Sequence, residues 1–318
     1  MSPGSSDHVS VFVERETLSA KKPTLWLRAR LIQAIRHFFT GKDYLEVETP
    51  CLIPAPAPEL HINPIQASGA FLHPSPELCM KRLLAAGYPR IFQICKCFRQ
   101  GERGGRHLPE FTLLEWYRAG TDYLGLMDEC EEMITFVLGE LGLPSVFLFQ
   151  GKTLDLQRPW QRFTLQEAFE RYASVPLEQA LSSGRFDEVL AFDVEPLLGH
   201  PKPVFLHCYP SALAALARLS KEAPGHAERF ELYAAGVELA NAFSELTDPD
   251  EQKARFETER AKRKEQAKTV YPMPEKFLRS LPFMPESAGI ALGVDRLVML
   301  LSNQKEIDSV VSFTPEEL

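Results

Sequence analysis

The segment from Ile91 to Arg118 constrains the fold most, because it has the pattern of two strands joined by a basic, glycine-rich loop. In the first half, alternate residues from Ile91 to Arg99 share one face. In the second half, one face carries Phe111, Leu113, Glu115 and Tyr117. One surface of the predicted hairpin therefore presents an arginine, an aromatic ring, a carboxylate and a phenol.

The predicted loop runs from Gln100 to Glu110 and holds Arg103, Arg106 and His107 among three glycines. Such a loop can place several positive donors over a polyphosphate while an aromatic ring stacks on a base. Taken alone, the segment is equally compatible with an ordinary hairpin that has a solvated basic turn.

Charge and composition exclude several classes of protein. The 318 residues include 35 basic and 43 acidic side chains, a formal net charge of −8, which disfavours broad non-specific binding to nucleic acid. No apolar run approaches the roughly 18 residues of a membrane span, and no signal pattern precedes residue 24, so we expect a cytoplasmic protein without membrane contact. The six cysteines show no C-x-x-C pairing; Cys95 and Cys97 form only a C-x-C pair in a predicted strand. We expect reduced, mostly buried thiols, and we assign no role to His61 or His73.

The N-terminal half is predicted to contain two helices that start at recognisable signals. We expect residues 1–23 to be disordered or loosely docked, and a helix to begin at Thr24, followed by a strand that ends before Pro50. A second helix is expected from Ser75, with Ser75 as N-cap and Pro76 at the first helical position. Residues 150–200 show little periodicity beyond a helix at 165–173, and we interpret them as an insertion.

The C-terminal half contains a second cluster of carboxylates. Two strands meet at residues 234–236 and bring Glu231 close to Glu238, a pair suited to magnesium with phosphate oxygens completing its shell. Asn241, Phe243 and Glu245 share a face with which Glu238 is out of phase, so a bulge is predicted near residues 239–240. Further on, residues 289–300 form a small-residue strand that runs into a helix.

These segments together resemble class II aminoacyl-tRNA synthetases, most closely the lysyl branch. Phe98-Arg99 and the run from Arg106 to Tyr117 match motif 2, residues 24–50 match motif 1, and residues 289–300 match motif 3. The sequence departs from motif 2 at Gln100 and Gly101; Glu102 stands one residue beyond the usual glutamate. The resemblance implies an α+β catalytic core over residues 24–318, an antiparallel β-sheet flanked by helices, and a homodimer formed through motif 1. A simple αβ unit in a monomer is the alternative for motif 1.

The resemblance also implies roles for individual residues. Arg99 and Arg296 would be catalytic, clamping phosphate oxygens of ATP, and magnesium would be held by Glu231 and Glu238. The other ATP-binding residues implied are Glu102, Arg106, His107, Phe111 and Gly293. The amino acid would be bound by Ser75, Glu77, Glu115, Tyr117, Asn241, Glu245 and Ala291. This second group is strongly anionic and suits a substrate with two ammonium groups, such as lysine.

Only residues 1–23 precede motif 1, so we expect no anticodon-binding domain. The chain resembles a truncated lysyl-type branch that attaches (R)-β-lysine to a lysine of translation elongation factor P. This branch has serine and alanine at the positions of Ser75 and Ala291, where lysyl synthetases have alanine and glycine. The implied function is ATP-dependent activation of lysine or (R)-β-lysine as an aminoacyl adenylate, then transfer to that protein, with tRNA not expected as the main acceptor. A minimal tRNA-charging enzyme, a small-molecule ligase and a non-catalytic regulatory paralogue remain alternatives. The sequence leaves open the preference between α-lysine and β-lysine and the identity of the acceptor.

Overall fold

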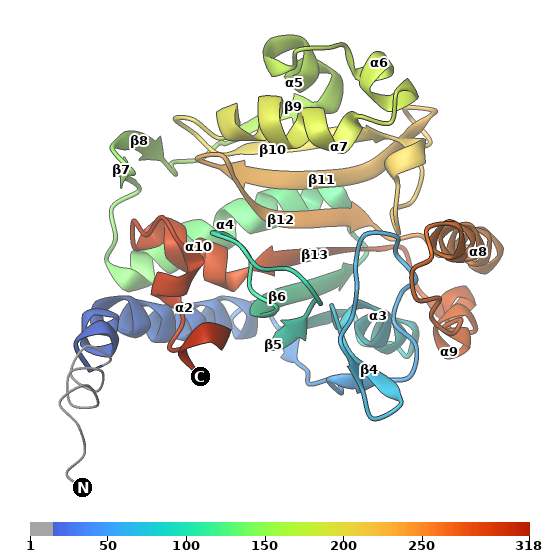
Figure 1. Ribbon diagram of the computed structural model, residues 1–318, viewed down its shortest axis with the longest axis horizontal. Helices are drawn as coiled ribbons and strands as arrows, with labels where there is room; N and C mark the ends of the chain where they lie inside the picture. Colours follow the sequence, from blue (N-terminus) through green and yellow to red (C-terminus); the bar gives the residue numbers. More distant parts are fainter. Residues whose placement is uncertain (1–14) are drawn as a thin grey trace, which may run out of the picture.

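The computed structural model describes residues 15–318 and is organised around one eight-stranded sheet (Figure 1). In spatial order the strands are β1 (Leu45–Glu46), β5 (Arg90–Phe98), β6 (Glu110–Ala119), β13 (Ser287–Gly293), β12 (Val237–Ser244), β11 (His226–Ala234), β10 (Val204–Pro210) and β9 (Gln161–Thr164). The pairs from β5 to β10 are antiparallel, whereas β1 and β9 join the two edges in parallel. The predicted α+β class is confirmed, and the predicted antiparallel sheet holds for its six central strands.

Two small sheets accompany the main one. One contains β2 (Leu52–Ile53), β4 (Ala70–Leu72) and β3 (Gln66–Ala67), and the other pairs β7 (Val146–Phe149) with β8 (Lys152–Asp155). Single 3-10 turns lie at Glu195–Leu197, Ser211–Leu213, Leu281–Phe283, Ile307–Val310 and Pro315–Glu317, and a π turn lies at Leu190–Val194.

One face of the sheet is covered by α2 (Lys22–Thr40), α4 (Tyr123–Leu141) and α10 (Val294–Leu301) (Figure 1). Aromatic rings join the two layers: the ring of Phe39 stacks on Phe92 with centroids 4.8 Å apart and lies 5.1 Å from Trp116. The other face carries α3 (Glu77–Ala85), α8 (Pro249–Glu265) and α9 (Glu275–Leu278). None of the helices within residues 15–318 combines the length and apolar character needed to cross a membrane.

The predicted flexible N-terminal segment is corrected for residues 15–23. Residues 15–20 are helical and α2 begins at Lys22, two residues before the predicted start. The physical reason is a buried ammonium: Lys21 Nζ lies 3.0 Å from a carboxylate oxygen of Glu317 and donates to the carbonyl of Ser312. This contact fixes the start of α2 to the C-terminal residues. The rest of that prediction falls on residues 1–14, outside the described residues.

Helix α3 begins at Glu77, one residue later than predicted. The hydroxyl of Ser75 still accepts a hydrogen bond from the Glu77 amide (3.0 Å), so Ser75 satisfies one of the free N–H groups at the start of the helix.

Residues 150–200, which we interpreted as an insertion, contribute to the main sheet, because β9 within them is its edge strand. The three helices that follow are α5 (Leu165–Tyr172), α6 (Leu177–Ser182) and α7 (Phe186–Val189). They bury their own apolar cluster against β10 and β11. Helix α5 confirms the helix predicted at 165–173, and its N-terminus carries a capping box from Thr164 and Glu167.

A nearly buried ion pair joins α2, β6 and α10. Arg28 Nη1 lies 2.5 Å from Asp295 Oδ1, and the two side chains are only 15% and 3% exposed. Thr112 completes the network, because its hydroxyl accepts from Arg28 (2.7 Å) and its amide donates to Asp295 (2.7 Å). Removing one partner leaves the other charge buried without compensation.

We therefore predict that Arg28→Leu lowers the free energy of unfolding by about 3 kcal/mol. The matched control is Arg36→Ala on the same helix, which breaks an exposed pair with Glu46 and should cost less than about 1 kcal/mol. Urea denaturation followed by circular dichroism measures both. Equal losses in the two variants would contradict a structural role for the Arg28–Asp295 pair.

Candidate functional site

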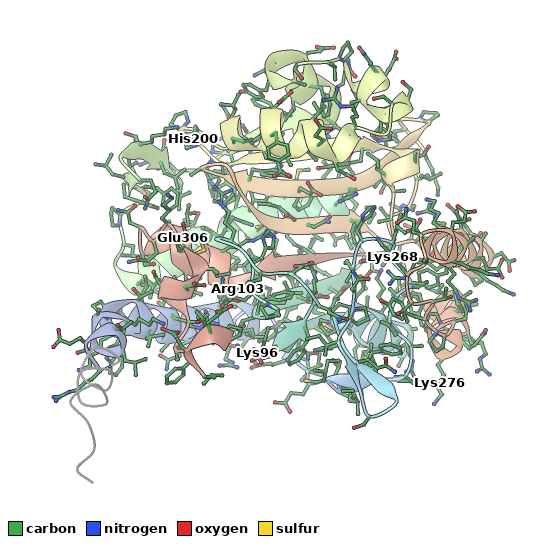
Figure 2. The ribbon with its side chains drawn as sticks, viewed as in Figure 1. Lys96, Arg103, His200, Lys268, Lys276 and Glu306 are labelled. Atoms are coloured by element: carbon green, nitrogen blue, oxygen red, sulfur yellow. The ribbon has the colours of Figure 1, made fainter. Side chains whose placement is uncertain are left out.

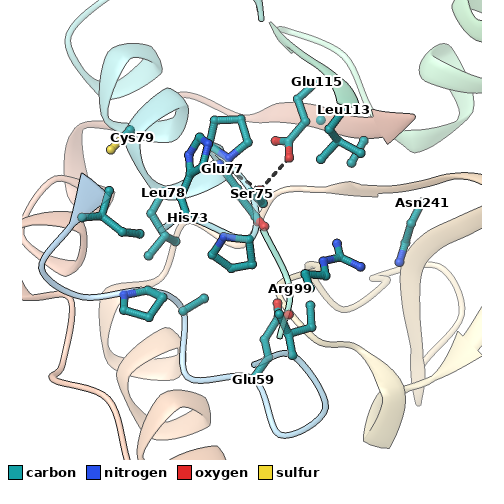
Figure 3. A pocket seen from close by; sticks show the side chains of 18 of the residues that line it. Glu59, His73, Ser75, Glu77, Leu78, Cys79, Arg99, Leu113, Glu115 and Asn241 are labelled. Atoms are coloured by element: carbon teal, nitrogen blue, oxygen red, sulfur yellow. Dashed lines mark hydrogen bonds between the residues drawn. The ribbon is translucent and has the colours of Figure 1, made fainter. Parts of the chain in front are cut away.

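A cavity of about 690 Å³ lies on the sheet face opposite α2 and α4 (Figure 3). Its floor consists of residues from β6, β12 and β13. Its walls come from α3, the loop between β5 and β6, and segments near residues 53–62 and 272–279, the second of which includes α9. Most of the predicted site residues line it. The exceptions are Glu231 and Glu245, which are buried beside it.

Strand register explains why the site residues converge. Glu115 on β6 pairs with Ala291 on β13, which pairs in turn with Asn241 on β12. Because residues opposite each other in neighbouring strands project to the same side, all three face the cavity. The bulge predicted near residues 239–240 is confirmed: Ala240 pairs with Leu232 and Glu238 with Tyr233, which leaves Leu239 unmatched. That extra residue brings Glu238 to the cavity with Asn241.

At one end of the cavity, Glu115 is held by two hydroxyl groups, of which that of Ser75 is labelled in Figure 3. The hydroxyl of Ser75 donates to Oε1 of Glu115 (2.6 Å), and that of Tyr117 donates to Oε2 (2.8 Å). Burial, and then the nearby charge of Glu77, raise the pKa of Glu115 to about 8. This carboxyl group therefore holds a proton at neutral pH until a cation approaches it.

Sequence reasoning missed the cation at the centre of this acidic cluster. The ammonium of Lys81, on α3 one turn beyond Glu77, forms ion pairs with both Glu77 and Glu245. It is 1% exposed. Lys81 therefore balances one of the negative charges of the group that the sequence marks as strongly anionic. The i, i+4 spacing of Glu77 and Lys81 was the available signal.

Two further carboxyl groups near the cavity also escaped prediction. Glu59, in the irregular segment before β3, lines the cavity, and burial followed by the charge of Glu77 raises its pKa to about 7. Glu195 comes from the 150–200 segment and accepts a hydrogen bond from Tyr233 (3.1 Å). Burial, together with the charges of Glu238 and Glu231, raises the pKa of Glu195. Neither residue belongs to a periodic pattern that could have revealed it.

Gly289 is required by close packing at the cavity floor. A Cβ atom at this position would lie within 2.5 Å of the Tyr117 ring and of a carboxylate oxygen of Glu245. By contrast, a Cβ at Gly293 would meet Arg296 only at ordinary contact distance (3.5 Å). Of the two glycines, only Gly289 is therefore fixed by steric exclusion.

The other end of the cavity is basic. The guanidinium of Arg99 lies 4.9 Å from the centroid of the Phe111 ring and 3.8 Å from the carboxylate of Glu102. Glu102 thus reaches the cavity despite the glycine at 101. Arg103 does not: it pairs with Asp308 and Glu316 on the outside, where the loop meets the C-terminal residues (Figure 2).

Arg296, in the first turn of α10, is the centre of this basic end. It donates to the backbone carbonyl (2.8 Å) and the carboxylate (3.1 Å) of Glu238, and to Nε2 of His107 (2.6 Å). Burial, and then the charge of Arg296, lower the pKa of His107. A neutral imidazole fits its role as acceptor here. Arg106 donates to the carbonyl of Gly236 (2.5 Å), which ties the motif 2 loop to the β11–β12 turn.

The two predicted magnesium ligands differ in what they still offer. Glu238 lies on the cavity wall, where carboxylate oxygens are the hard donors that magnesium prefers. Glu231 already accepts from Arg229 (2.6 Å), Tyr209 (2.6 Å) and Tyr233 (2.7 Å). An ionised carboxylate has about four acceptor positions, so Glu231 has about one left. The donor set fits magnesium with Glu238 as the principal protein ligand and Glu231 in a supporting position.

We predict that Lys81→Met lowers the free energy of unfolding by about 3 kcal/mol, because it leaves Glu77 and Glu245 without their buried cation. The double variant Lys81→Met/Glu245→Gln should recover part of this loss, since it removes one uncompensated carboxylate. Chemical denaturation of both single variants and the double variant completes the cycle. Additive losses would show that the Lys81–Glu245 pair is not coupled.

Comparison with known proteins agrees with this geometry. The family model described as tRNA synthetases class II (D, K and N) matches residues 13–317. The protein named elongation factor P–(R)-β-lysine ligase from Pectobacterium carotovorum is 40% identical, over 94% of this chain and 97% of the relative. Proteins of the same name from Enterobacter sp. (strain 638) and Salmonella gallinarum are 37% and 38% identical, each over 93% of this chain and 96% of the relative.

The relatives are named as ligases, and the matched family comprises synthetases that use ATP, so the prediction of an ATP-dependent ligase is confirmed. The three predicted motifs, the sheet that carries them and the cavity between them lead to one conclusion. The chain belongs to the class II aminoacyl-tRNA synthetase family of the aspartyl, lysyl and asparaginyl type.

Proposed function

We propose that this protein activates lysine or (R)-β-lysine with ATP and transfers it to a lysine side chain of translation elongation factor P. The observation that carries the proposal is that one cavity joins two arginines at one end to a cluster of buried carboxyl groups at the other. The names of the relatives support the acceptor.

In the first step, the substrate carboxylate attacks the α-phosphorus of ATP. A new P–O bond forms as the bond to pyrophosphate breaks, which gives an aminoacyl adenylate. Orientation and charge neutralisation are enough for this reaction, and no side-chain nucleophile is needed. In our proposal Arg99 and Arg296 neutralise phosphate oxygens, Phe111 stacks on the adenine, and Arg106 with neutral His107 borders the phosphate tail.

In this proposal Glu238 would be a ligand of magnesium, with Glu231 in support, and the ion would offset negative charge on the phosphates. In the free protein, Arg296 donates a hydrogen bond to one carboxylate oxygen of Glu238. Incoming phosphates would give Arg296 an alternative anionic partner, and the carboxylate of Glu238 would then be available to hold the metal.

The acidic end suits the ammonium groups of the amino acid. Ser75, Glu115 and Tyr117 form one hydrogen-bonded row, and Asn241 lies across the floor with its side-chain oxygen held by Arg229 (3.2 Å). The methyl group of Ala291 lies between Glu115 and Asn241 in the register. It removes volume where an amino group shifted by one carbon would matter, and a methyl-scale difference is worth about 1–3 kcal/mol of discrimination.

In the second step, the amine of the acceptor lysine attacks the adenylate carbonyl. A C–N amide bond forms, AMP leaves, and the amine loses a proton. The acceptor would approach the motif 2 loop, where Arg106 borders the cavity while Arg103 is held by Asp308 and Glu316.

We also propose a homodimer through motif 1, since Trp26 on α2 is 71% exposed. Light scattering would measure the mass of the particle.

The first prediction of this proposal concerns substrate choice. ATP–pyrophosphate exchange should occur with (R)-β-lysine or α-lysine, and the label should then pass to elongation factor P rather than to lysine tRNA. Arg99→Ala should abolish exchange, because it removes a cation from the nucleotide end, while circular dichroism shows a folded protein. Exchange retained in that variant would refute the role of Arg99. Label on tRNA alone would indicate a minimal synthetase, and no exchange with any diamine would indicate a binding paralogue.

The second prediction concerns pH. A bound ammonium favours the ionised form of Glu115, whose pKa in the free protein is about 8. Raising the pH towards 8 therefore removes the proton that opposes binding, and the KM for the amino acid should fall, by at most about tenfold per pH unit. Glu115→Gln keeps one acceptor oxygen, places an NH2 donor where the second oxygen was, and cannot titrate, so its KM should depend less on pH. An unchanged pH profile in this variant would exclude Glu115 as the linked group.

A further inference from the structure

Three potential metal ligands meet at the edge of the cavity, and none of them is among the proposed magnesium ligands. They are His73, which lies between β4 and α3, and Cys95 and Cys97 on β5. One ligand atom from each lies within 4.8 Å of the other two. Within residues 15–318, this is the one group of three or more histidine, cysteine and acidic side chains that comes so close together.

The spacing of the two sulfur atoms matches a tetrahedral metal site. They lie 3.9 Å apart. A tetrahedral ion with Zn–S bonds of about 2.3 Å holds two sulfur ligands about 3.8 Å from each other. A disulfide needs a separation of about 2.0 Å, so the two sulfur atoms are not bonded to each other. They are in hydrogen-bond contact as thiols, at a separation that two ligands of one tetrahedral ion would also have.

His73 is oriented as a metal-binding histidine usually is. Its Nε2 atom lies 2.7 Å from the carbonyl oxygen of Lys96, the residue between the two cysteines (labelled in Figure 2). With the proton on Nε2 donated to this carbonyl, the lone pair resides on Nδ1. Histidines that bind metals characteristically donate their second N–H to a carbonyl or carboxylate in this way. The side chain is 1% exposed, so the ring is held by packing as well.

The surroundings also allow an ion to enter. Cys97 is buried, but Cys95 is partly exposed and His73 lines the cavity. Across the hairpin, Cys97 pairs with Phe111 and Cys95 with Leu113, both of which are cavity residues. An ion held here would therefore link the segment just before Ser75 to the strand beneath the proposed nucleotide-binding ring.

We propose that His73, Cys95 and Cys97 bind one thiophilic divalent cation of the zinc class, with a fourth position left for water. Binding replaces the two thiol protons, which are released to solvent, and involves no redox change. The two cysteines supply soft sulfur ligands, which distinguish this site from the oxygen ligands of Glu231 and Glu238. The inference does not depend on the proposed ligase activity.

The test uses the full chain, stripped with a chelator and reduced, and titrated with cobalt(II) and zinc(II). Cobalt should produce the sulfur-to-metal charge-transfer absorption of a thiolate complex, and one equivalent of zinc should abolish it. Cys95→Ser and Cys97→Ser should each lose this band, and elemental analysis after desalting should show one zinc per chain only in the parent. Circular dichroism verifies that each variant is folded, and the partly exposed Cys95 provides a readout if Cys97→Ser does not fold.

Two matched controls separate this site from others. Cys79→Ser removes a thiol that lines the same cavity but lies outside the group, and Glu238→Gln removes the proposed magnesium ligand. Both should keep the cobalt band. The proposal is overturned if the parent gives no thiolate band, if the band survives in both cysteine variants, or if mass spectrometry shows a Cys95–Cys97 disulfide that persists under reducing conditions.

Discussion

The site depends on one constraint: carboxylates buried on the cavity face of the sheet need cations, and few are within reach. Burial disfavours the charged forms of Glu115 and Glu245 and raises the pKa of each, and Glu77 shares the ammonium of Lys81 with Glu245. Lys81 on α3 supplies such a cation. Its ammonium pairs with Glu77 on the same helix and with Glu245 just after β12, so it also fixes α3 against the sheet. The same pairing places Ser75, just before α3, within 2.6 Å of Glu115. The contacts that compensate the buried charges thus also set the geometry of the proposed substrate site.

At the opposite end of the cavity the positive charges are in excess, and the guanidinium groups interact with acceptors of the protein itself. Arg296 is held by Glu238 and by the neutral ring of His107, and Arg99 by Glu102 and the face of Phe111. Such contacts keep the guanidinium groups ordered and close to where phosphates would lie. In the proposed function, a polyphosphate would replace these acceptors with stronger ones, and the arginines would need little reorganisation.

Sequence reasoning predicted those parts of the structure in which the side chains alternate with the regular period of a strand. Alternation along residues 91–118 identified the hairpin and its cavity face, and the phase mismatch between Glu238 and Asn241 identified the bulge, both as the structure has them. Lys81 was missed because helical spacing marks its position as buried but does not say that an ammonium will be buried there. Glu59 and Glu195 lie in aperiodic segments, where only the tertiary fold brings a carboxyl group to the site. The start of α2 was misplaced for a similar reason, since Lys21 is held by residues almost three hundred positions away.

The floor strand β13 connects these two ends and shows why small residues occupy it. At Gly289 any side chain would enter the space of Tyr117 and Glu245, so the acidic end can close only over a glycine. Two residues on, Ala291 is opposite both Glu115 and Asn241, where a methyl group is tolerated. Two residues further, Gly293 borders Arg296 and the nucleotide end. The strand period places these three positions on one face. Under the proposed function, the size of the residue at 291 would therefore adjust the volume left for the amino acid without moving either charged end. In the proposed function, the charges define the class of substrate, and the floor sets which isomer fits.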